Sequence, residues 1–307
     1  MQFPSRRFEK SFTQQKPLPP ASLTAASDVL NHGRLHRYNR LSDEVTETAR
    51  LEREFARWMG ARYCLAVTSG GYAMACALRA LPIRQNAPVL TNAFTLAPVP
   101  GAILAAGGRP VLVESTGDLV IDIDDLEHRI AETGSRHLLV SHMRGHICDM
   151  DHLMSVCRAH DVMVIEDCAH TMGAGFRDVR SGRHGTIACF STQTYKHMNS
   201  GEGGLITTDD EDLMARMIVL SGSYMFYDQH DAGPGPDCYE ELVNVIPNMS
   251  GRMDNLRAAI LRPQLEDLAE ACRGWTERYR TIESVLLASS DITAIPRSPE
   301  EDFVGSS

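Results

Sequence analysis

The chain has 307 residues, of which 43% are hydrophobic and 23% charged, and its formal net charge is −10. This composition is typical of a globular protein with a sizeable core, built as one large domain or as a large and a small one. The acidic balance argues against a nucleic-acid-binding protein, which usually presents a basic face. No apolar run approaches the roughly 20 residues that cross a bilayer, and the first residues lack the apolar core of a signal peptide. We therefore expect a cytoplasmic protein that does not enter membranes.

The cysteines and histidines do not predict a metal site. The eight cysteines are scattered, and none forms a C-x-x-C pair, so reduced and mostly buried thiols are expected. His142, His146 and Asp149, in "HMRGHICD", have a spacing that can suggest a metal. Two histidines without a matched third ligand are a weak signal, however, and we predict no bound metal.

We predict that residues 1–50 form an N-terminal arm and an entry segment. From Leu51 onward, expected helices and strands alternate regularly. The expected strands are short and apolar. They span Tyr63–Val67, Ala87–Thr91, Arg109–Glu114, His137–His142 and Asp161–Asp167. The expected helices are Leu51–Gly60, Gly70–Leu81, Ala97–Gly108, Ile121–Glu132 and Asp149–His160. Unbroken apolar strands that alternate with helices are typical of an α/β fold, with a mostly parallel sheet covered on both faces.

After Asp167 the pattern changes to two neighbouring strands and then to helices. Strands are expected at Ile187–Thr192 and Gly203–Thr208, followed by a helix over Asp209–Gly222. Residues 224–246 are irregular. A long helical pattern then covers 252–288, and Pro263 should kink or divide it. We predict a large domain over 51–250, and a linking helix with the incomplete start of a small domain over 251–307.

Three features fall after expected strands, where ligands bind in parallel α/β sheets. The pair Gly70-Gly71 opens a helix, whose free N–H groups favour a phosphate. Asp167 ends a buried strand, and Lys196 lies between a strand and the turn 201–204. Taken singly, these are explained by helix capping, a structural salt bridge and a surface lysine. Together they fit pyridoxal 5′-phosphate (PLP), which needs a lysine for its Schiff base, an acid at its ring nitrogen and a helix N-terminus for its phosphate.

The motifs that contain these residues occur in a known order. "VIEDCAHTMGA" (164–174), "GTIACFSTQTYKHMNSGEGGLITT" (185–208) and "SGRMDNLRAAILRPQL" (250–265) follow the entry helix "LEREFARWMG". In these motifs the chain resembles the DegT/DnrJ/StrS aminotransferases, which are fold type I PLP enzymes that act largely on keto-sugar nucleotides. The resemblance implies a three-layer α/β/α large domain with a mixed, mostly parallel sheet. It also implies an incomplete C-terminal small domain, since family members continue well past the long helix.

The same resemblance implies roles for individual residues. Lys196 would form the Schiff base, Asp167 would bind the pyridine nitrogen, and His170 would contact the phenolic oxygen of the ring. Ser191 and the backbone at Gly70-Gly71 would hold the phosphate. These residues are the expected catalytic and cofactor-binding set, while the residues that bind the substrate remain unassigned.

The family is dimeric, so the resemblance also implies a homodimer with shared sites, in which the loop near Ser250 reaches the partner's phosphate. Three positions depart from the family pattern. Gly71 replaces a threonine that contacts the phosphate, Leu96 replaces an aromatic residue that stacks on the ring, and Ser250 replaces an asparagine. Phe94 and Tyr72 are the candidates to replace the missing aromatic ring.

The function implied is transfer of an amino group from glutamate or glutamine to a keto-sugar, nucleotide-linked or related. One alternative is lyase or dehydratase chemistry on the same scaffold, although the dehydratase branch has a histidine where this chain has Lys196. Another is a non-catalytic homologue that binds PLP or a sugar nucleotide as a sensor or partner subunit. A third is a degenerate fragment without a ligand.

Overall fold

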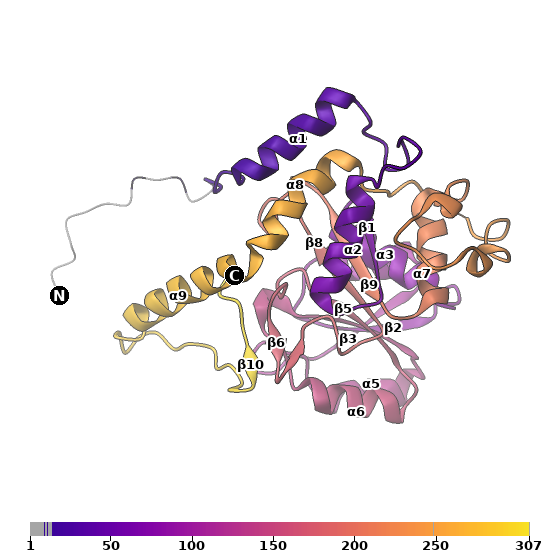
Figure 1. Cartoon of the computed structure of the whole chain (residues 1–307). Coiled ribbons are helices and arrows are strands. Elements are labelled where there is room, and N and C mark those ends of the chain that lie inside the picture. The colour runs from indigo at the N-terminus through magenta and orange to yellow at the C-terminus, as the bar shows by residue number, and fades with distance from the viewer. Residues whose placement is uncertain (1–8, 10, 12–13, 248, 307) are drawn as a thin grey trace.

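The computed structural model describes residues 9, 11, 14–247 and 249–306. Its centre is a seven-stranded sheet with the order β1-β9-β8-β5-β4-β2-β3. These strands are β1 (Tyr63–Val67), β2 (Pro88–Asn92), β3 (Arg109–Val113), β4 (His137–Ser141), β5 (Met163–Asp167), β8 (Ile187–Ser191) and β9 (Gly204–Thr208). Strand β9 runs antiparallel to β1 and β8, and the other neighbours pair in parallel. The predicted mixed, mostly parallel sheet is confirmed (Figure 1).

Most of the described helices begin at a residue whose side chain caps them, whereas α1, α4 and α9 have no side-chain cap. They are α1 (Pro20–His32), α2 (Glu47–Met59), α3 (Gly70–Ala80), α4 (Pro98–Ala105), α5 (Ile123–Thr133), α6 (Met150–Ala159), α7 (Glu211–Ile218), α8 (Asn255–Glu266) and α9 (Leu268–Leu286). Ser69, Asp122 and Asp210 each accept a hydrogen bond from a first-turn N–H group, which satisfies donors that the helix itself leaves free. Short turns of 3-10 helix occur at Met143–Gly145, Tyr227–Gln229 and Pro236–Tyr239, and a π-helical turn covers Val219–Ser223.

Helices cover both faces of the sheet, as the predicted three layers require. One buried cluster joins the sheet to α2, α5, α6 and α8, for example through Phe55, Leu126 and Leu261. The other joins the opposite face to α3, α4 and α7, through Leu78 and Ile103 among others. Burial of these apolar side chains is the main stabilising term and fixes the carboxyl ends of the strands relative to one another.

Three parts of the chain differ from expectation. Helix α1 was not predicted, although Pro20 at its start and a left-handed Gly33 at its end are ordinary helix boundaries. The long C-terminal pattern divides at Asp267 rather than at Pro263, which lies inside α8. A second sheet of β10 (Glu301–Asp302), β6 (Gly175–Phe176) and β7 (Val179–Arg180) was also missed. Its pairing brings the chain back from α9 to the body (Figure 1).

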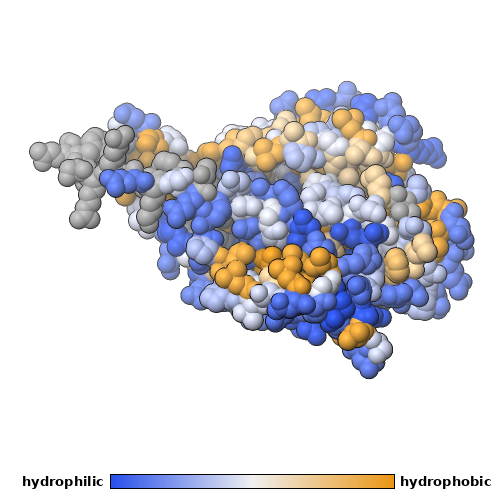
Figure 2. All heavy atoms as spheres, turned by 90° about the horizontal axis from the view of Figure 1, so that it is seen from above, coloured by the Kyte–Doolittle hydropathy of each residue, from blue (hydrophilic) through white to orange (hydrophobic). Residues whose placement is uncertain are grey.

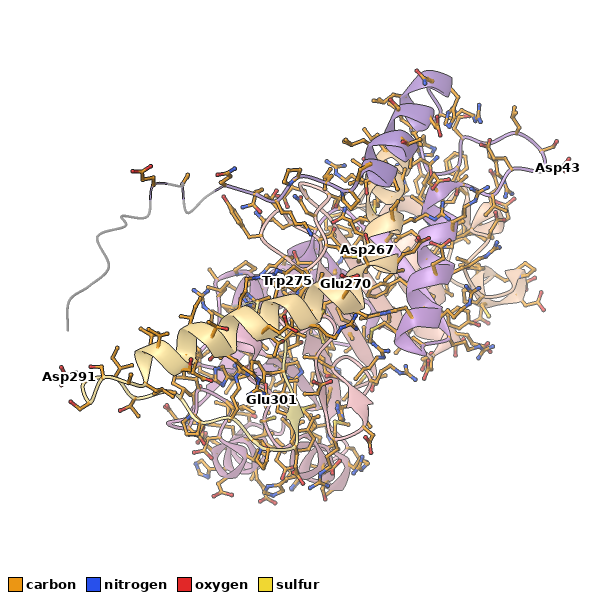
Figure 3. The ribbon with its side chains drawn as sticks, turned by 60° about the vertical axis from the view of Figure 1, so that its left-hand side comes forward. Asp43, Asp267, Glu270, Trp275, Asp291 and Glu301 are labelled. Carbon is orange, nitrogen blue, oxygen red and sulfur yellow. The ribbon has the colours of Figure 1, made fainter. Side chains whose placement is uncertain are left out.

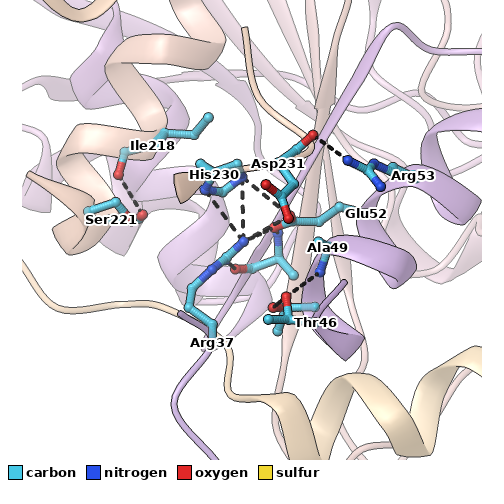
Figure 4. Close-up of polar contacts among 12 residues, drawn as sticks. Arg37, Thr46, Ala49, Glu52, Arg53, Ile218, Ser221, His230 and Asp231 are labelled. Atoms are coloured by element: carbon cyan, nitrogen blue, oxygen red, sulfur yellow. Dashed lines mark hydrogen bonds and ion pairs between the residues drawn. The ribbon is translucent and has the colours of Figure 1, made fainter. Parts of the chain in front are cut away.

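A buried ion pair fixes the entry segment to the first strand (Figure 4). Both carboxylate oxygens of Glu52, on α2, lie 2.8 Å from an Arg37 nitrogen, and His230 is 3.3 Å from the same carboxylate. Arg37 also donates to the carbonyl of Ala66 in β1, and the N–H of Ala66 donates to Glu52. Burial raises the pKa of Glu52, but Arg37 and His230 outweigh burial and lower it to about 2. The cluster therefore holds β1, and the turn that follows it, in place.

The face seen in Figure 2 carries many hydrophilic residues, with hydrophobic residues gathered in patches between them. Exposed apolar residues include Leu23 and Leu30 of α1 and Val285 of α9. Across the part of the chain that the structure describes, no helix combines the length and the apolar character needed to span a membrane.

Candidate active site

The carboxyl ends of β4, β5 and β8 bring the predicted acid and the predicted lysine loop together. Asp167 is the last residue of β5 and pairs in register with Ser141 of β4 on one side and with Cys189 of β8 on the other. Ser191 ends β8, and Lys196 follows it in the loop that leads to β9. The parallel arrangement therefore places the side chains expected to be catalytic at one edge of the sheet.

Asp167 is buried, but its carboxylate accepts hydrogen bonds from two donors. The Ser141 hydroxyl donates to one carboxylate oxygen over 2.8 Å, and the N–H of Ala169 donates to the other over 3.2 Å. Burial raises the pKa of Asp167 despite these bonds and the charge of Lys196. A desolvated carboxylate of this kind gains most from a cation placed against it, because the cation restores the ionised form.

Lys196 and His170 form a direct pair. The Lys196 Nζ atom lies 2.9 Å from Nε2 of His170, and the lysine side chain is half-buried. Burial lowers the pKa of Lys196, and the nearby charge of Arg144 lowers it further, while Asp167 opposes the change. Burial, together with Lys196 and Arg144, also lowers the pKa of His170 to about 4. His170 is thus neutral at pH 7, and its ring nitrogen can accept a hydrogen bond from the lysine.

The start of α3 lies against Ser191. A β-carbon added to Gly70 would come within 2.8 Å of the Ser191 β-carbon, so only glycine permits this approach. The Ser69 hydroxyl caps the helix by accepting a hydrogen bond from the Tyr72 N–H. The Gly70 and Gly71 N–H groups belong to the first helical turn, whose donors point away from the helix. The serine hydroxyl and the helix terminus lie together and are chemically suited to an anion, while their predicted role in holding a phosphate stays a prediction.

The departures from the family pattern are also visible. A β-carbon on Gly71 would meet the Pro98 side chain only at 3.8 Å, so the position has space for a larger residue. Leu96 is 46% exposed and fills no core position. The Tyr72 hydroxyl donates to the carbonyls of Met249 and Leu220, which commits this ring to the neighbouring loop. Phe94 is half-buried two residues after the end of β2 and remains the candidate for a stacking ring.

Ser250 lies in an exposed loop that crosses the body of its own chain. The adjacent Gly251 accepts a hydrogen bond from the Thr68 N–H over 2.9 Å, and Tyr72 packs against Gly251. The loop therefore passes close to the turn that precedes α3. Its predicted contact with a partner's phosphate site concerns a second chain and stays a prediction.

The two histidines considered as metal ligands, His142 and His146, have different surroundings. His142 contacts the buried carboxylate of Glu166 at 3.0 Å, and burial lowers the pKa of His146 to about 4. His142, Glu166 and Cys168 lie close enough to share an ion. Three backbone N–H groups, from 182, 184 and 185, nevertheless occupy the Glu166 oxygens. Burial also raises the pKa of the Cys168 thiol, so this set favours a hydrogen-bonded core over metal binding.

A cavity of about 320 Å³ opens beside Lys196. It is bordered by the described N-terminal segment and the first turns of α9, with Lys16, Tyr195, Asp267 and Trp275 in its wall. Asp267 marks the start of α9 and Trp275 lies further along the helix (Figure 3). The cavity combines aromatic rings with charged groups, as sites for polar organic ligands do.

Two residues at the site were not foreseen. Ser141 could have been found, because it ends the strand beside Asp167 and a short polar side chain there faces the same edge. Arg144 could not, because its position depends on a left-handed backbone at φ 54° that no local pattern predicts.

The comparison with known proteins agrees with this geometry. The profile of the DegT/DnrJ/EryC1/StrS aminotransferase family matches residues 22–306. The chain belongs to this family. The resemblance inferred from the motifs is therefore confirmed.

Individual family members are similar over most of this chain. GDP-perosamine synthase from Caulobacter vibrioides is 34% identical over 234 residues, which are 74% of this chain and 60% of the relative. L-glutamine:scyllo-inosose aminotransferase from Streptomyces griseus is 29% identical, over 80% of this chain and 58% of the relative. The chain thus spans about three-fifths of the length of these curated relatives.

Solved structures of aminotransferases and related enzymes share the fold. The crystal structure of 3-amino-5-hydroxybenzoic acid synthase superposes with a TM-score of 0.84 at 24% identity, over 96% of this chain and 74% of that one. An aminotransferase from Psychrobacter cryohalolentis gives 0.82 at 24% identity, over 95% and 76%. The predicted fold type I architecture is confirmed.

Proposed function

We propose that this chain is a PLP-dependent aminotransferase that moves an amino group from glutamate or glutamine to a keto-sugar or a related cyclic ketone. The observation that carries the proposal is the contact between Lys196, in the loop after β8, and His170, which follows β5. Their nitrogens lie 2.9 Å apart, and Asp167 ends the same β5. A half-buried lysine with a lowered pKa, next to a neutral histidine, is chemically poised rather than structural.

The residues fit PLP. The buried Asp167 carboxylate suits a cationic ring nitrogen, and the contact of Gly70 with Ser191 leaves a cradle of N–H and hydroxyl groups for a phosphate. We infer that Lys196 holds the cofactor covalently and that His170 faces its phenolic oxygen. When bound, PLP supplies an electron-withdrawing ring that makes the Cα proton of an amino acid removable.

The protein's own contribution is proton transfer and orientation. Because burial lowers the pKa of Lys196, a larger fraction of its amine is unprotonated near neutral pH than for an exposed lysine. Its Nζ can then take the proton from Cα of the donor and deliver it again as an acid. His170 orients Nζ through their hydrogen bond, and Ser141 keeps the Asp167 carboxylate directed by donating to it.

The substrate class is inferred from the relatives and from the cavity. Both named relatives act on sugars or cyclitols according to their names, and one uses L-glutamine. The mixture of aromatic and charged residues beside Lys196 suits a polar ring. We expect the keto acceptor to enter from this cavity, next to the reacting nitrogen.

The test uses PLP, [¹⁵N]glutamate and [¹⁵N]glutamine as donors, with scyllo-inosose and GDP-4-keto-6-deoxymannose as acceptors. Labelled amine in the product is expected with the wild-type chain and with Arg109→Gln, and none with Lys196→Ala. Arg109 is a suitable control because it is an exposed cation at the amino end of β3 and does not line the cavity. PLP uptake without any amine transfer would instead support the non-catalytic alternative, and release of ammonia without transfer would support lyase chemistry.

A further inference from the structure

Arg144 is a cation beside the site that the steps above do not use. It lies in the turn Met143–Gly145 directly after β4, and its side chain is exposed. Among the residues that the structure describes, its guanidinium makes no hydrogen bond and no ion pair, whereas Arg34, Arg37 and Arg262 pair with carboxylates. An arginine that is held near a catalytic lysine without a protein partner is available to an anionic ligand.

The turn that carries Arg144 is fixed against the site. A β-carbon on the neighbouring Gly145 would lie 3.2 Å from the His170 carbonyl oxygen, so the two backbones touch. The Gly145 carbonyl accepts a hydrogen bond from Arg297 over 2.8 Å, and Arg297 pairs with the buried Glu301 at 2.7 Å. Gly145, which touches the backbone of His170, is the next residue after Arg144, and consecutive Cα atoms are 3.8 Å apart. The backbone of Arg144 is therefore held close to the segment that bears His170.

The backbone of Arg144 has φ 54° and ψ 23°, a left-handed conformation that is uncommon outside glycine. Such a conformation is unfavourable for a residue with a side chain and persists where the surroundings impose it, often at functional sites. Its charge also reaches the reacting groups, since it lowers the pKa of both Lys196 and His170.

The strand order separates Arg144 from the phosphate cradle. The cradle is built by Ser191 of β8 and by Gly70, which follows β1. Arg144 follows β4, which lies on the opposite side of β5 and therefore of Asp167. A cofactor phosphate in the cradle would therefore leave the guanidinium free, so an anion bound at Arg144 would belong to a substrate.

We propose that Arg144 binds the α-carboxylate of the amino donor, an assignment that rests on the proposed aminotransferase function. In an amino acid the carboxylate is attached to the same carbon as the nitrogen that takes the place of Lys196. It must therefore lie close to Nζ, where the Arg144 turn is. In a nucleotide-linked keto-sugar the phosphates are several bonds from the reacting carbon, so they fit this position less well.

The first test compares Arg144→Gln with Arg144→Lys and with Arg109→Gln. Gln keeps a β-carbon at the left-handed position. Arg109 is an exposed arginine at the amino end of β3, whereas Arg144 follows the carboxyl end of β4. We expect Arg144→Gln to raise the glutamate concentration needed for half-maximal bleaching of the PLP-loaded protein about 10- to 100-fold, as for loss of a charged hydrogen bond. Arg144→Lys should recover part of this loss and Arg109→Gln should behave as wild type.

Two substrates separate the donor from the acceptor. 4-Aminobutyrate lacks the α-carboxylate of glutamate, so the preference of the wild type for glutamate over 4-aminobutyrate should collapse in Arg144→Gln. Transfer from the amine-loaded protein to scyllo-inosose should be unchanged. The assignment would be overturned if Arg144→Gln impaired only the transfer to a phosphate-bearing ketone. It would also be overturned if the wild type and Arg144→Gln needed the same glutamate concentration for half-maximal bleaching.

A second readout needs no cofactor. The pKa of the Lys196 amine in the PLP-free protein is measured from the pH dependence of its acetylation, by peptide mass spectrometry, with and without succinate. Succinate should raise this pKa in the wild type, because a bound carboxylate neutralises Arg144, and should not change it in Arg144→Gln. No effect of succinate in the wild type would contradict the inference. If the wild type does not take up PLP on Lys196, the proposed function fails; if it does and both proteins consume glutamate alike, only the inference fails.

Discussion

The neighbouring glycines at the start of α3 should respond in opposite ways to substitution. A threonine at Gly71 has space, since its β-carbon would meet Pro98 at an ordinary 3.8 Å, and it would add a hydroxyl at the predicted phosphate cradle. One hydrogen bond to a charged group contributes about 1.5–3 kcal/mol, so Gly71→Thr should lower the Kd for PLP about 10-fold or more. The measurement is a titration of PLP into the protein, followed by absorbance.

Gly70→Ala is the matched variant and should have the opposite effect on PLP binding. Its β-carbon would lie 2.8 Å from that of Ser191, and Ser191 is fixed by its pairing with Gly204 of β9. The helix start must therefore shift, which costs roughly 1–3 kcal/mol and should weaken PLP binding. If neither substitution changes the Kd, or if Gly70→Ala tightens binding, the start of α3 is not the phosphate site and the reasoning is wrong.

Three further substitutions test the surroundings. Glu52 has a pKa of about 2 against an ordinary 4.5, which corresponds to ~3 kcal/mol of stability that is present above pH 4.5 and lost as the pH falls toward 2. Glu52→Gln should therefore unfold at lower urea concentration at pH 7 and show a flatter loss of stability toward acid; equal slopes in the two proteins would refute this. Asp167→Asn should lower turnover at least about 100-fold without lowering the melting temperature, because the buried carboxylate serves the ligand rather than the fold. Ser141→Ala removes a hydrogen bond that favours the Asp167 carboxylate, so the Kd for PLP should rise about 10-fold, and more at low pH; a pH-independent Kd would count against it.

Much of the fold follows from local patterns. The strands were predicted because each is a short apolar run between polar turns, and the two strands around Lys196 are separated by a glycine-rich loop. The end of α8 was not predicted, because the helix continues through Pro263 and ends only at Asp267, so the effect of the proline was overestimated. The small sheet was missed because two-residue strands such as β10 have no period to recognise.

The candidate site also has a part that the sequence predicts and a part that needs the structure. The placement of Asp167 at the end of β5 and of Lys196 in the loop after β8 could be predicted, because the sequence marks the ends of these strands. Their chemical roles stay predictions. The Lys196–His170 contact is also consistent with the motif, although it joins residues 26 apart. Arg144 needed the structure, because a left-handed turn and the contact of Gly145 with His170 decide where its charge lies.

The most direct measurement of the central claim is chemical trapping of the cofactor. The chain has only three lysines, Lys10, Lys16 and Lys196, so the modified position is unambiguous. PLP is added to the purified protein, the visible spectrum is recorded before and after glutamate, and borohydride reduction is followed by peptide mapping. We predict a yellow protein that glutamate bleaches, with the pyridoxyl group on Lys196. A folded protein that remains colourless, or that carries the label only at Lys10 or Lys16, would contradict the proposed function.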